Sequence, residues 1–291
     1  MSTKGTKGPE QLVQEARAWW STEIVDIHPG KISFRGYPVQ DLIGEIRFPE
    51  MIWLMLRGEL PARAQSDLLE AALVASVDHG PQAPSIAIAR MAVTCGLPLN
   101  GAMASGINAL DDIHGGAGQQ CMQIYQRIAA LVEKGSEPGA AVDAVLDDFI
   151  AEHGKIIPGF GHRFHPTDPR TPKLLQLVEN ARVQGVIDGR YARIGIAVEE
   201  ALAKRTGKRI PMNIDGVTAV IFSELGFAAE LGRGLFILSR AVGILSHAWE
   251  QTRQGGRIKG PMPKDIPYSY TGVEERRLAP RSSSTRHTED T

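Results

Sequence analysis

Residues 232–253 read GRGLFILSRAVGILSHAWEQTR, and this segment gives the clearest indication of the architecture. Its apolar residues recur at intervals of three and four, which is the period of an amphipathic α-helix. Gly255 and Gly256 follow, and glycine is typical just beyond the C-terminus of a helix. We therefore expect one long helix over residues 232–253.

The same period extends along most of the chain, and β-branched alternation is scarce. Pro9 and Pro49 can each open a helix, Gly58 closes the second, and Ser66 is the predicted N-cap of a helix over 68–77. One short extended piece is expected over 31–34. Further helices are predicted at about 84–95, 100–111, 116–134, 139–153, 171–184, 190–206, 216–230 and 232–253. The predicted fold class is all-α.

Composition excludes several classes of protein. The 291 residues carry 32 Lys and Arg against 33 Asp and Glu, so there is no basic field to attract nucleic acid or an anionic membrane. The N-terminus lacks an apolar signal region, and Gly96 and Pro98 interrupt the uncharged stretch 91–110, which argues against a membrane span. Two cysteines are too few for a disulfide framework, so we expect a cytoplasmic protein. The polar tail from about Glu274 is expected to be a solvated extension.

Common catalytic motifs are absent from the sequence. There is no Walker loop, HExxH or GxSxG, and Gly159-Phe160-Gly161 lacks the third glycine of a dinucleotide fingerprint. His162 and His165 are close together but have no carboxylate partner at ligand spacing, so no metal site is predicted.

Reactive side chains gather at junctions between predicted helices, each flanked by glycine or proline. Three histidines and an aspartate suit proton transfer next to a carbonyl group, with a carboxylate as base and neutral imidazoles as hydrogen-bond donors. Nearby arginines would bind a di- or tricarboxylate. Taken singly, each of these residues is more typical of a cap, a turn or a surface charge. The four junctions are Val77-Asp78-His79-Gly80, Ile113-His114-Gly115-Gly116, Pro158-Gly159-Phe160-Gly161-His162-Arg163 and Asn213-Ile214-Asp215-Gly216.

Together with further motifs, the junctions resemble the citrate synthase superfamily over about residues 20–270. The additional motifs, in chain order, are Phe34-Arg35-Gly36-Tyr37, Gly58-Glu59-Leu60-Pro61, Asp168-Pro169-Arg170 and Ser239-Arg240-Ala241-Val242-Gly243. Only 16 residues separate Pro61 from Asp78, where ordinary citrate synthases have a long helical segment. This short form, with the ending Lys264-Asp265-Ile266-Pro267-Tyr268, resembles the citryl-CoA lyase module of ATP-citrate lyase.

The resemblance implies an all-α, citrate-synthase-like architecture. A large domain formed by 1–115 and 227–291 would hold a small helical domain, 116–226, as an insertion, with the active site between them. It also implies a homodimer or higher homo-oligomer, a coenzyme A thioester as substrate, no metal or other cofactor, and a possible separate CoA-ligase partner.

The resemblance also assigns roles by position. Asp215 matches the base for the acetyl-CoA methyl proton, His114 the donor to the thioester oxygen, and His162 the group that exchanges a proton with the oxaloacetate carbonyl or citryl hydroxyl. His79 matches the histidine that polarises this carbonyl. The carboxylate-binding arginines correspond to Arg170 and Arg240, and the coenzyme A site to Gly159, Phe160, Gly161, Lys208 and Asn213.

Two departures from the family leave the substrate open. The ATP-citrate lyase module carries an aromatic residue at the position of His114, whereas citrate synthases keep the histidine. The arginine that citrate synthases supply from the other subunit is expected near Gly260 and is missing. Three alternatives are open: Arg257, Lys259 or Lys264 replaces its charge, the substrate carries an apolar group there, or the loop aligns differently with the family.

We therefore expect a citryl-CoA lyase that cleaves citryl-CoA to acetyl-CoA and oxaloacetate through an enolic intermediate. The alternatives are a citrate or 2-methylcitrate synthase, a related enzyme that condenses acyl-CoA with another 2-oxo acid, and a non-catalytic acyl-CoA-binding module.

Overall fold

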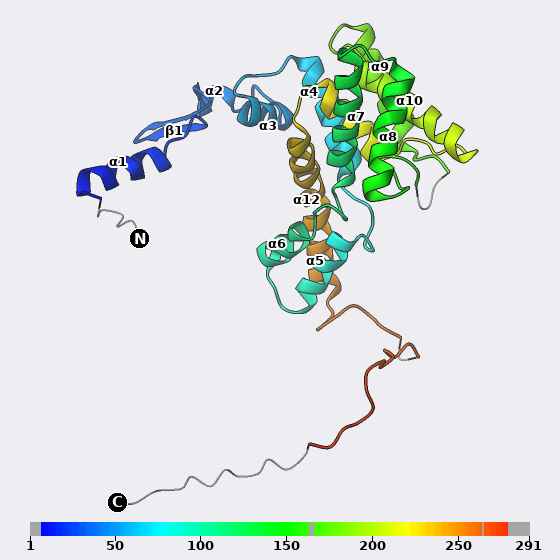
Figure 1. Cartoon of the computed structure of the whole chain (residues 1–291). Coiled ribbons are helices and arrows are strands. Elements are labelled where there is room, and N and C mark those ends of the chain that lie inside the picture. Colours follow the sequence, from blue (N-terminus) through cyan, green and yellow to red (C-terminus); the bar gives the residue numbers. More distant parts are fainter. Residues whose placement is uncertain (1–6, 163–165, 264, 279–291) are drawn as a thin grey trace, which may run out of the picture.

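The computed structural model describes residues 7–162, 166–263 and 265–278. Helices dominate it, and the strands are confined to the N-terminal region (Figure 1). The elements before the first reactive junction are α1 (Pro9–Trp19), β1 (Val25–His28), β2 (Lys31–Phe34), β3 (Tyr37–Pro38), α2 (Val39–Leu42), α3 (Phe48–Arg57) and α4 (Arg63–Ser76). The later helices are α5 (Pro84–Thr94), α6 (Leu99–Asn108), α7 (Ala117–Glu133), α8 (Pro138–His153), α9 (Arg170–Val183), α10 (Arg190–Thr206), α11 (Ile214–Glu224) and α12 (Ala229–Gln254).

The all-α prediction is confirmed, with two local corrections. Ser66 is not an N-cap, because α4 begins at Arg63, and the buried Ser66 hydroxyl accepts a hydrogen bond from Arg47 instead. The helix predicted over 216–230 ends earlier than expected, and the helix predicted over 232–253 begins earlier. α11 ends at Glu224, and Gly226 turns the chain with φ of 75° before α12 begins.

The strands form a small antiparallel sheet in the order β1-β2-β3. β2 matches the predicted extended piece, and its residues pair in register with β1 from Val25↔Phe34 to His28↔Lys31. β3 pairs with the C-terminal end of β2 through Phe34↔Tyr37. The reversal between β2 and β3 puts Arg35 at φ of 49°, and its guanidinium donates to the Met55 carbonyl of α3, which ties the sheet to the helical body.

The helical body contains two apolar clusters. The larger joins α3 and α4 to α7, α8, α9, α10 and α11, with Tyr125 and Leu69 fully buried in it. The smaller joins α5 and α6 to the C-terminal half of α12 around Ile86 and Ile244. α12 passes from the larger cluster to the smaller one (Figure 1). The loops that connect the helices of the two clusters therefore lie next to the central turns of α12. The predicted domain boundaries at 116 and 226 stay a prediction.

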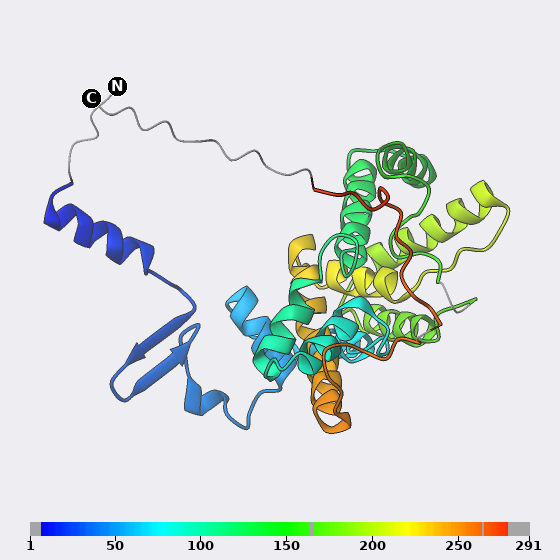
Figure 2. The same cartoon turned by 90° about the horizontal axis from the view of Figure 1, so that it is seen from below.

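Both ends of the described chain lie outside the helical body (Figures 1 and 2). α1 buries none of its residues, and Trp19 and Trp20 are each 79% exposed. The segment after α12 is extended, with Tyr268 and Tyr270 exposed. Within the described ranges, no helix is both long enough and apolar enough to cross a membrane. The uncharged stretch 91–110 forms the end of α5, a turn and α6.

Candidate active site

The four reactive junctions converge on one cavity of about 540 Å³. The chain enters this region after α4, before α7, after α8 and at the start of α11, and α12 closes one side. The lining residues are Ser76, His79, Gln82, Ala83, Pro84, Ile113, His114, Gly115, Ala117, Gly161, His162, Asn213, Ile214, Asp215, Phe236 and Arg240.

Asp215 is fixed by the first turn of α11. Asn213 is the N-cap of this helix, and its Oδ1 accepts hydrogen bonds from the backbone N–H groups of Asp215 at 2.9 Å and Gly216 at 3.3 Å. The Asn213 amide donates to the Gly161 carbonyl at 2.7 Å, which joins the start of α11 to the loop after α8. A Cβ at Gly216 would overlap the carbonyl oxygen of Gly159, so this close approach requires glycine.

Burial raises the pKa of the Asp215 carboxyl group above its usual range. The nearby guanidinium groups of Arg170 and Arg240 oppose this shift, but burial has the larger effect. An aspartate in such a place is a stronger base than a solvated one, and it keeps its proton to a higher pH. The group is therefore suited to exchange a proton with a carbon acid in either direction.

His114 is held in a defined orientation by the N-terminus of α5. Its Nε2 accepts a hydrogen bond from the Ser85 backbone N–H at 3.1 Å and lies 3.0 Å from the Ser85 hydroxyl. Because Nε2 is an acceptor, the ring proton is on Nδ1. Burial lowers the pKa of His114, and the positive charge of Arg240 and the His79 ring lower it further. His114 is thus a neutral hydrogen-bond donor at the cavity wall.

His79 and His162 both line the cavity, and their rings are in edge-to-face contact. Their ring centroids are 5.8 Å apart, and the rings are inclined at 65°. Burial lowers the pKa of His79, as do the charges of Arg170 and Arg240. His79 therefore supplies a neutral imidazole in the same cavity as the Asp215 carboxylate.

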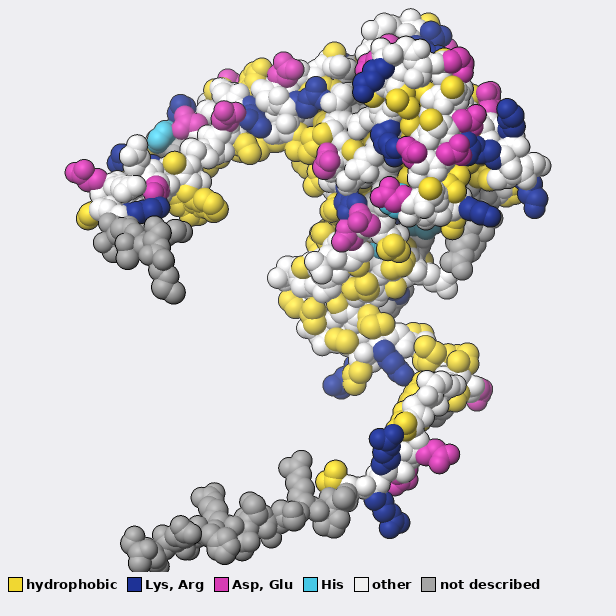
Figure 3. All heavy atoms as spheres, viewed as in Figure 1, with side chains coloured by type: hydrophobic (Ala, Val, Ile, Leu, Met, Phe, Trp, Pro, Cys, Tyr) yellow, Lys and Arg dark blue, Asp and Glu magenta, His cyan; other side chains and the backbone are white. Residues whose placement is uncertain are grey.

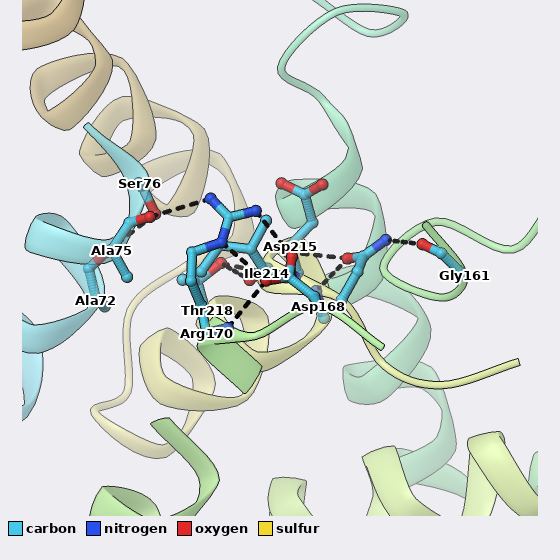
Figure 4. A network of polar contacts seen from close by, with 11 residues as sticks. Ala72, Ala75, Ser76, Gly161, Asp168, Arg170, Ile214, Asp215 and Thr218 are labelled. Atoms are coloured by element: carbon cyan, nitrogen blue, oxygen red, sulfur yellow. Dashed lines mark hydrogen bonds and ion pairs between the residues drawn. The ribbon is translucent and has the colours of Figure 1, made fainter. Parts of the chain in front are cut away.

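The two predicted carboxylate-binding arginines differ in their surroundings. Arg240 of α12 lines the cavity, with its guanidinium 4.8 Å from the Phe236 ring centroid and its Nε donating to the Ser76 carbonyl at 3.3 Å. Arg170 lies behind the lining, where it donates to both carboxylate oxygens of Asp168, at 2.9 and 2.8 Å, and to the Ala75 carbonyl at 3.2 Å (Figure 4).

Asp168 is fully buried and joins two elements of the site. Besides Arg170, it accepts a hydrogen bond from the Ile214 backbone N–H at 3.2 Å, at the start of α11 (Figure 4). Burial would raise its pKa, but the hydrogen bonds and charge of Arg170 outweigh this and bring the pKa to about 2. The Arg170–Asp168 pair thus supports the helix end that carries Asp215.

Of the residues predicted to bind coenzyme A, Gly161 and Asn213 line the cavity, whereas Gly159, Phe160 and Lys208 do not. Phe160 is buried against Tyr125, with ring centroids 6.4 Å apart, and Lys208 is exposed in the connection before α11. Gly260 lies in the exposed segment after α12 and is not part of the cavity lining. Arg163, His165 and Lys264 lie outside the described residues.

Sequence reasoning missed Ser85, Gln82 and Phe236. Ser85 is the second residue of a helix opened by Pro84, and a backbone N–H there is available to a ligand or side chain, which is a recognisable signal. Gln82 and Phe236 had no local signal, because only the folded chain brings them to the cavity. Among the described residues, no group of three or more His, Cys, Asp or Glu side chains is placed to hold a metal ion.

Comparison with known proteins identifies the family. The model for the citrate synthase C-terminal domain matches residues 15–73 and 63–261. The chain belongs to the citrate synthase family. A curated relative, citrate synthase of Acidithiobacillus ferridurans, is 29% identical over 235 residues, which cover 79% of this chain and 57% of the relative. The chain thus spans little more than half the length of such relatives.

Solved structures of family members match over most of the chain. Citryl-CoA lyase from Hydrogenobacter thermophilus is 33% identical, with a TM-score of 0.78, and the match covers 89% of this chain and 97% of that one. ATP citrate lyase from Methanothrix soehngenii, solved with citrate and coenzyme A, is 21% identical with a TM-score of 0.72. That match covers 96% of this chain but 47% of the other, and at this identity it shows the citrate-synthase-like fold alone.

Proposed function

We propose that this chain is a citryl-CoA lyase, which cleaves citryl-CoA to acetyl-CoA and oxaloacetate. The observation that carries the proposal is the match to almost the full length of a citryl-CoA lyase, together with a cavity that gathers the predicted acid, base and hydrogen-bond donors.

The cavity residues divide the cleavage into two proton transfers. His162 takes the proton from the citryl hydroxyl group. The bond between C2 and C3 then breaks, and the electron pair of this bond moves to the thioester oxygen of the leaving enolate. The Nδ1–H of His114 donates to this oxygen, and His79 donates to the oxygen that becomes the oxaloacetate carbonyl. Asp215, whose raised pKa favours the protonated form, then delivers a proton to the enolate carbon and forms the methyl group of acetyl-CoA.

Two positive groups are proposed to orient the substrate carboxylates. Arg240 reaches the cavity directly, and two of the five N–H donors of Arg170 are not used by Asp168 or Ala75. Lys208, Asn213 and the backbone from Gly159 to Gly161 are proposed to bind coenzyme A. We propose that Arg257 or Lys259 of a second copy supplies the charge expected near Gly260.

A homo-oligomer is supported by an apolar stripe on α12. Leu238, Val242, Leu245 and Trp249 follow one another at intervals of four, three and four residues and are 39–55% exposed. Ile88 and Met91 of α5 are exposed as well, and apolar side chains cover much of this lower part of the molecule (Figures 1 and 3). We propose that a second copy covers this face.

Two further proposals concern a partner enzyme and the location of the protein in the cell. Cleavage of citryl-CoA requires a separate reaction that joins citrate to coenzyme A, so we propose a CoA-ligase partner. Cys95 and Cys121 are both unpaired thiols, which supports a reducing, cytoplasmic location.

Incubation of the purified chain with citryl-CoA tests the proposal. We expect acetyl-CoA and oxaloacetate to appear together, with oxaloacetate detected by NADH oxidation through malate dehydrogenase. The same chain is then given acetyl-CoA plus oxaloacetate, and free thiol release is followed. Cleavage without net citrate formation supports the lyase, whereas efficient citrate formation would favour a synthase, the function suggested by retention of His114. Binding of coenzyme A without either reaction would mean a binding module and would contradict the proposal.

A further inference from the structure

α12 packs tightly against the turn that carries His79. A Cβ at Gly243 would overlap the Val77 carbonyl oxygen and lie 3.1 Å from an Asp78 carboxylate oxygen, so the helix backbone touches this turn directly. His247 lies one helical turn after Gly243 on the same face. Its Nε2 is 3.3 Å from Asp78 Oδ1.

Both ring nitrogens of His247 have partners. Nε2 faces the Asp78 carboxylate, and Nδ1 lies 3.4 Å from Nη1 of Arg90 on α5. A guanidinium can only donate, so Nδ1 is the acceptor and Nε2 carries the proton that is donated to Asp78. Arg90 is itself held by Glu250 at 2.8 Å and Gln254 at 2.7 Å, and Glu250 lies 3.8 Å from Nδ1. The orientation of the His247 ring is therefore defined from both sides.

Asp78 passes this constraint on to His79. Its Oδ2 accepts a hydrogen bond from the Gly80 backbone N–H at 3.0 Å, and the carboxylate also accepts one from the His79 backbone N–H. Burial works to raise the pKa of Asp78, but these hydrogen bonds and the contact with His247 outweigh it and lower the pKa. The ionised carboxylate thus holds both peptide groups that flank the His79 side chain.

We propose that His247 is a positioning residue for the reaction. Through Asp78 it fixes the turn so that the His79 imidazole points at the substrate oxygen. The inference rests on the proposed function, because the oxygen in question is the one that becomes the oxaloacetate carbonyl. His247 is not among the residues that line the cavity, so it acts on the substrate only through this turn. Arg90 is the next residue of the same chain of contacts.

The variants His247→Gln and His247→Met test the proposal as a matched pair. Both side chains have similar length, but only glutamine keeps an N–H donor near the position of Nε2. We expect kcat for citryl-CoA cleavage to fall about 10- to 100-fold in the Met variant, the scale of a misplacement of about 1 Å, and to stay near wild type in the Gln variant. Arg253→Ala, which shortens an exposed side chain in the last turn of α12 and keeps Arg90, His247 and Asp78, is the control and should remain near wild type.

A spectroscopic measurement separates positioning from general damage. The 13C chemical shift of bound [2-13C]oxaloacetate reports polarisation of its carbonyl group. We expect this shift to move toward the free value in His247→Met and to be restored in His247→Gln, with little change in the KM for citryl-CoA. Asp78→Asn supplies a second variant if His247→Met does not fold. The double variant that combines His247→Met with Asp78→Asn should cleave citryl-CoA no more slowly than the slower of the two single variants, because both residues act on one turn.

The outcomes distinguish this inference from the proposed function. If the wild-type chain neither cleaves citryl-CoA nor binds oxaloacetate, the proposed function fails and the inference falls with it. If the wild-type chain cleaves citryl-CoA but the folded Met variant has unchanged kcat and carbonyl shift, only the inference is overturned. Equal losses in the Gln and Met variants would also overturn it, because the donated hydrogen bond would then have no part in positioning His79.

Discussion

Single residues of the site obtain their chemistry from burial and from hydrogen bonds with backbone groups. Burial makes Asp215 a stronger base, and the Ser85 N–H fixes the tautomer of His114. The sequence placed both residues at helix junctions but held no information on their ionisation, because the groups that cause these shifts come from remote elements. Arg170 illustrates the same point. Its position in Asp168-Pro169-Arg170 predicts a carboxylate ligand, yet the carboxylate it binds in the structure is that of Asp168.

The raised pKa of Asp215 predicts how stability depends on pH. A carboxyl group whose pKa is higher in the folded state stabilises the fold at acidic pH, below its unfolded pKa, and this contribution is lost as pH rises through the folded pKa. Asparagine does not ionise, so Asp215→Asn does not lose this stability as pH rises. We expect the variant to melt at a higher temperature than the wild type at pH 7–8, with a smaller difference at pH 4. A melting temperature that is lower at pH 7–8 would instead mean that the ionised carboxylate stabilises the fold.

Helices were predicted correctly where the apolar periodicity agrees with proline or glycine residues at the helix ends. Pro9, Pro49 and Gly58 mark helix ends within a residue or two. The break between α11 and α12 was predicted, but at residue 230 instead of Glu224, because apolar residues continue past Glu224 and sequence periodicity does not register the turn at Gly226. β1 and β3 were missed because short exposed strands depend on pairing with β2 rather than on a pattern of their own.

The contact between α11 and the loop after α8 yields a prediction at this scale. Gly216→Ala forces the start of α11 away from Gly159, so we expect a loss of about 1–3 kcal/mol in the free energy of unfolding and a large fall in activity. Gly118→Ala is the matched control, because a Cβ in this helical position meets only the Asp215 carbonyl at 4.0 Å. Urea unfolding of the two variants should show the difference, and equal stability would argue against the close contact.

At the scale of the molecule, the exposed stripe on α12 predicts self-association. Val242 is 55% exposed at its centre, and a glutamate there would place charge within the face that a second copy covers. We expect Val242→Glu to shift the protein to the monomer, as measured by light scattering after size exclusion. Val183→Glu at the end of α9, a helix that packs on α4 and α11 and where Val183 is 71% exposed, should leave the oligomer intact. A wild-type chain that is already a monomer would contradict the prediction.

Carbon–carbon cleavage is proposed to occur in the cavity at Asp215, and the roles proposed for the other cavity residues depend on this. The most direct test is the rate at which Asp215→Asn cleaves citryl-CoA, compared with wild type, in protein shown by circular dichroism to be folded. Asparagine keeps the shape of the side chain but cannot exchange the proton, so we predict a kcat lower by about 10²–10⁴-fold, the scale of lost general acid–base catalysis. A folded variant that cleaves citryl-CoA at the wild-type rate would contradict the account.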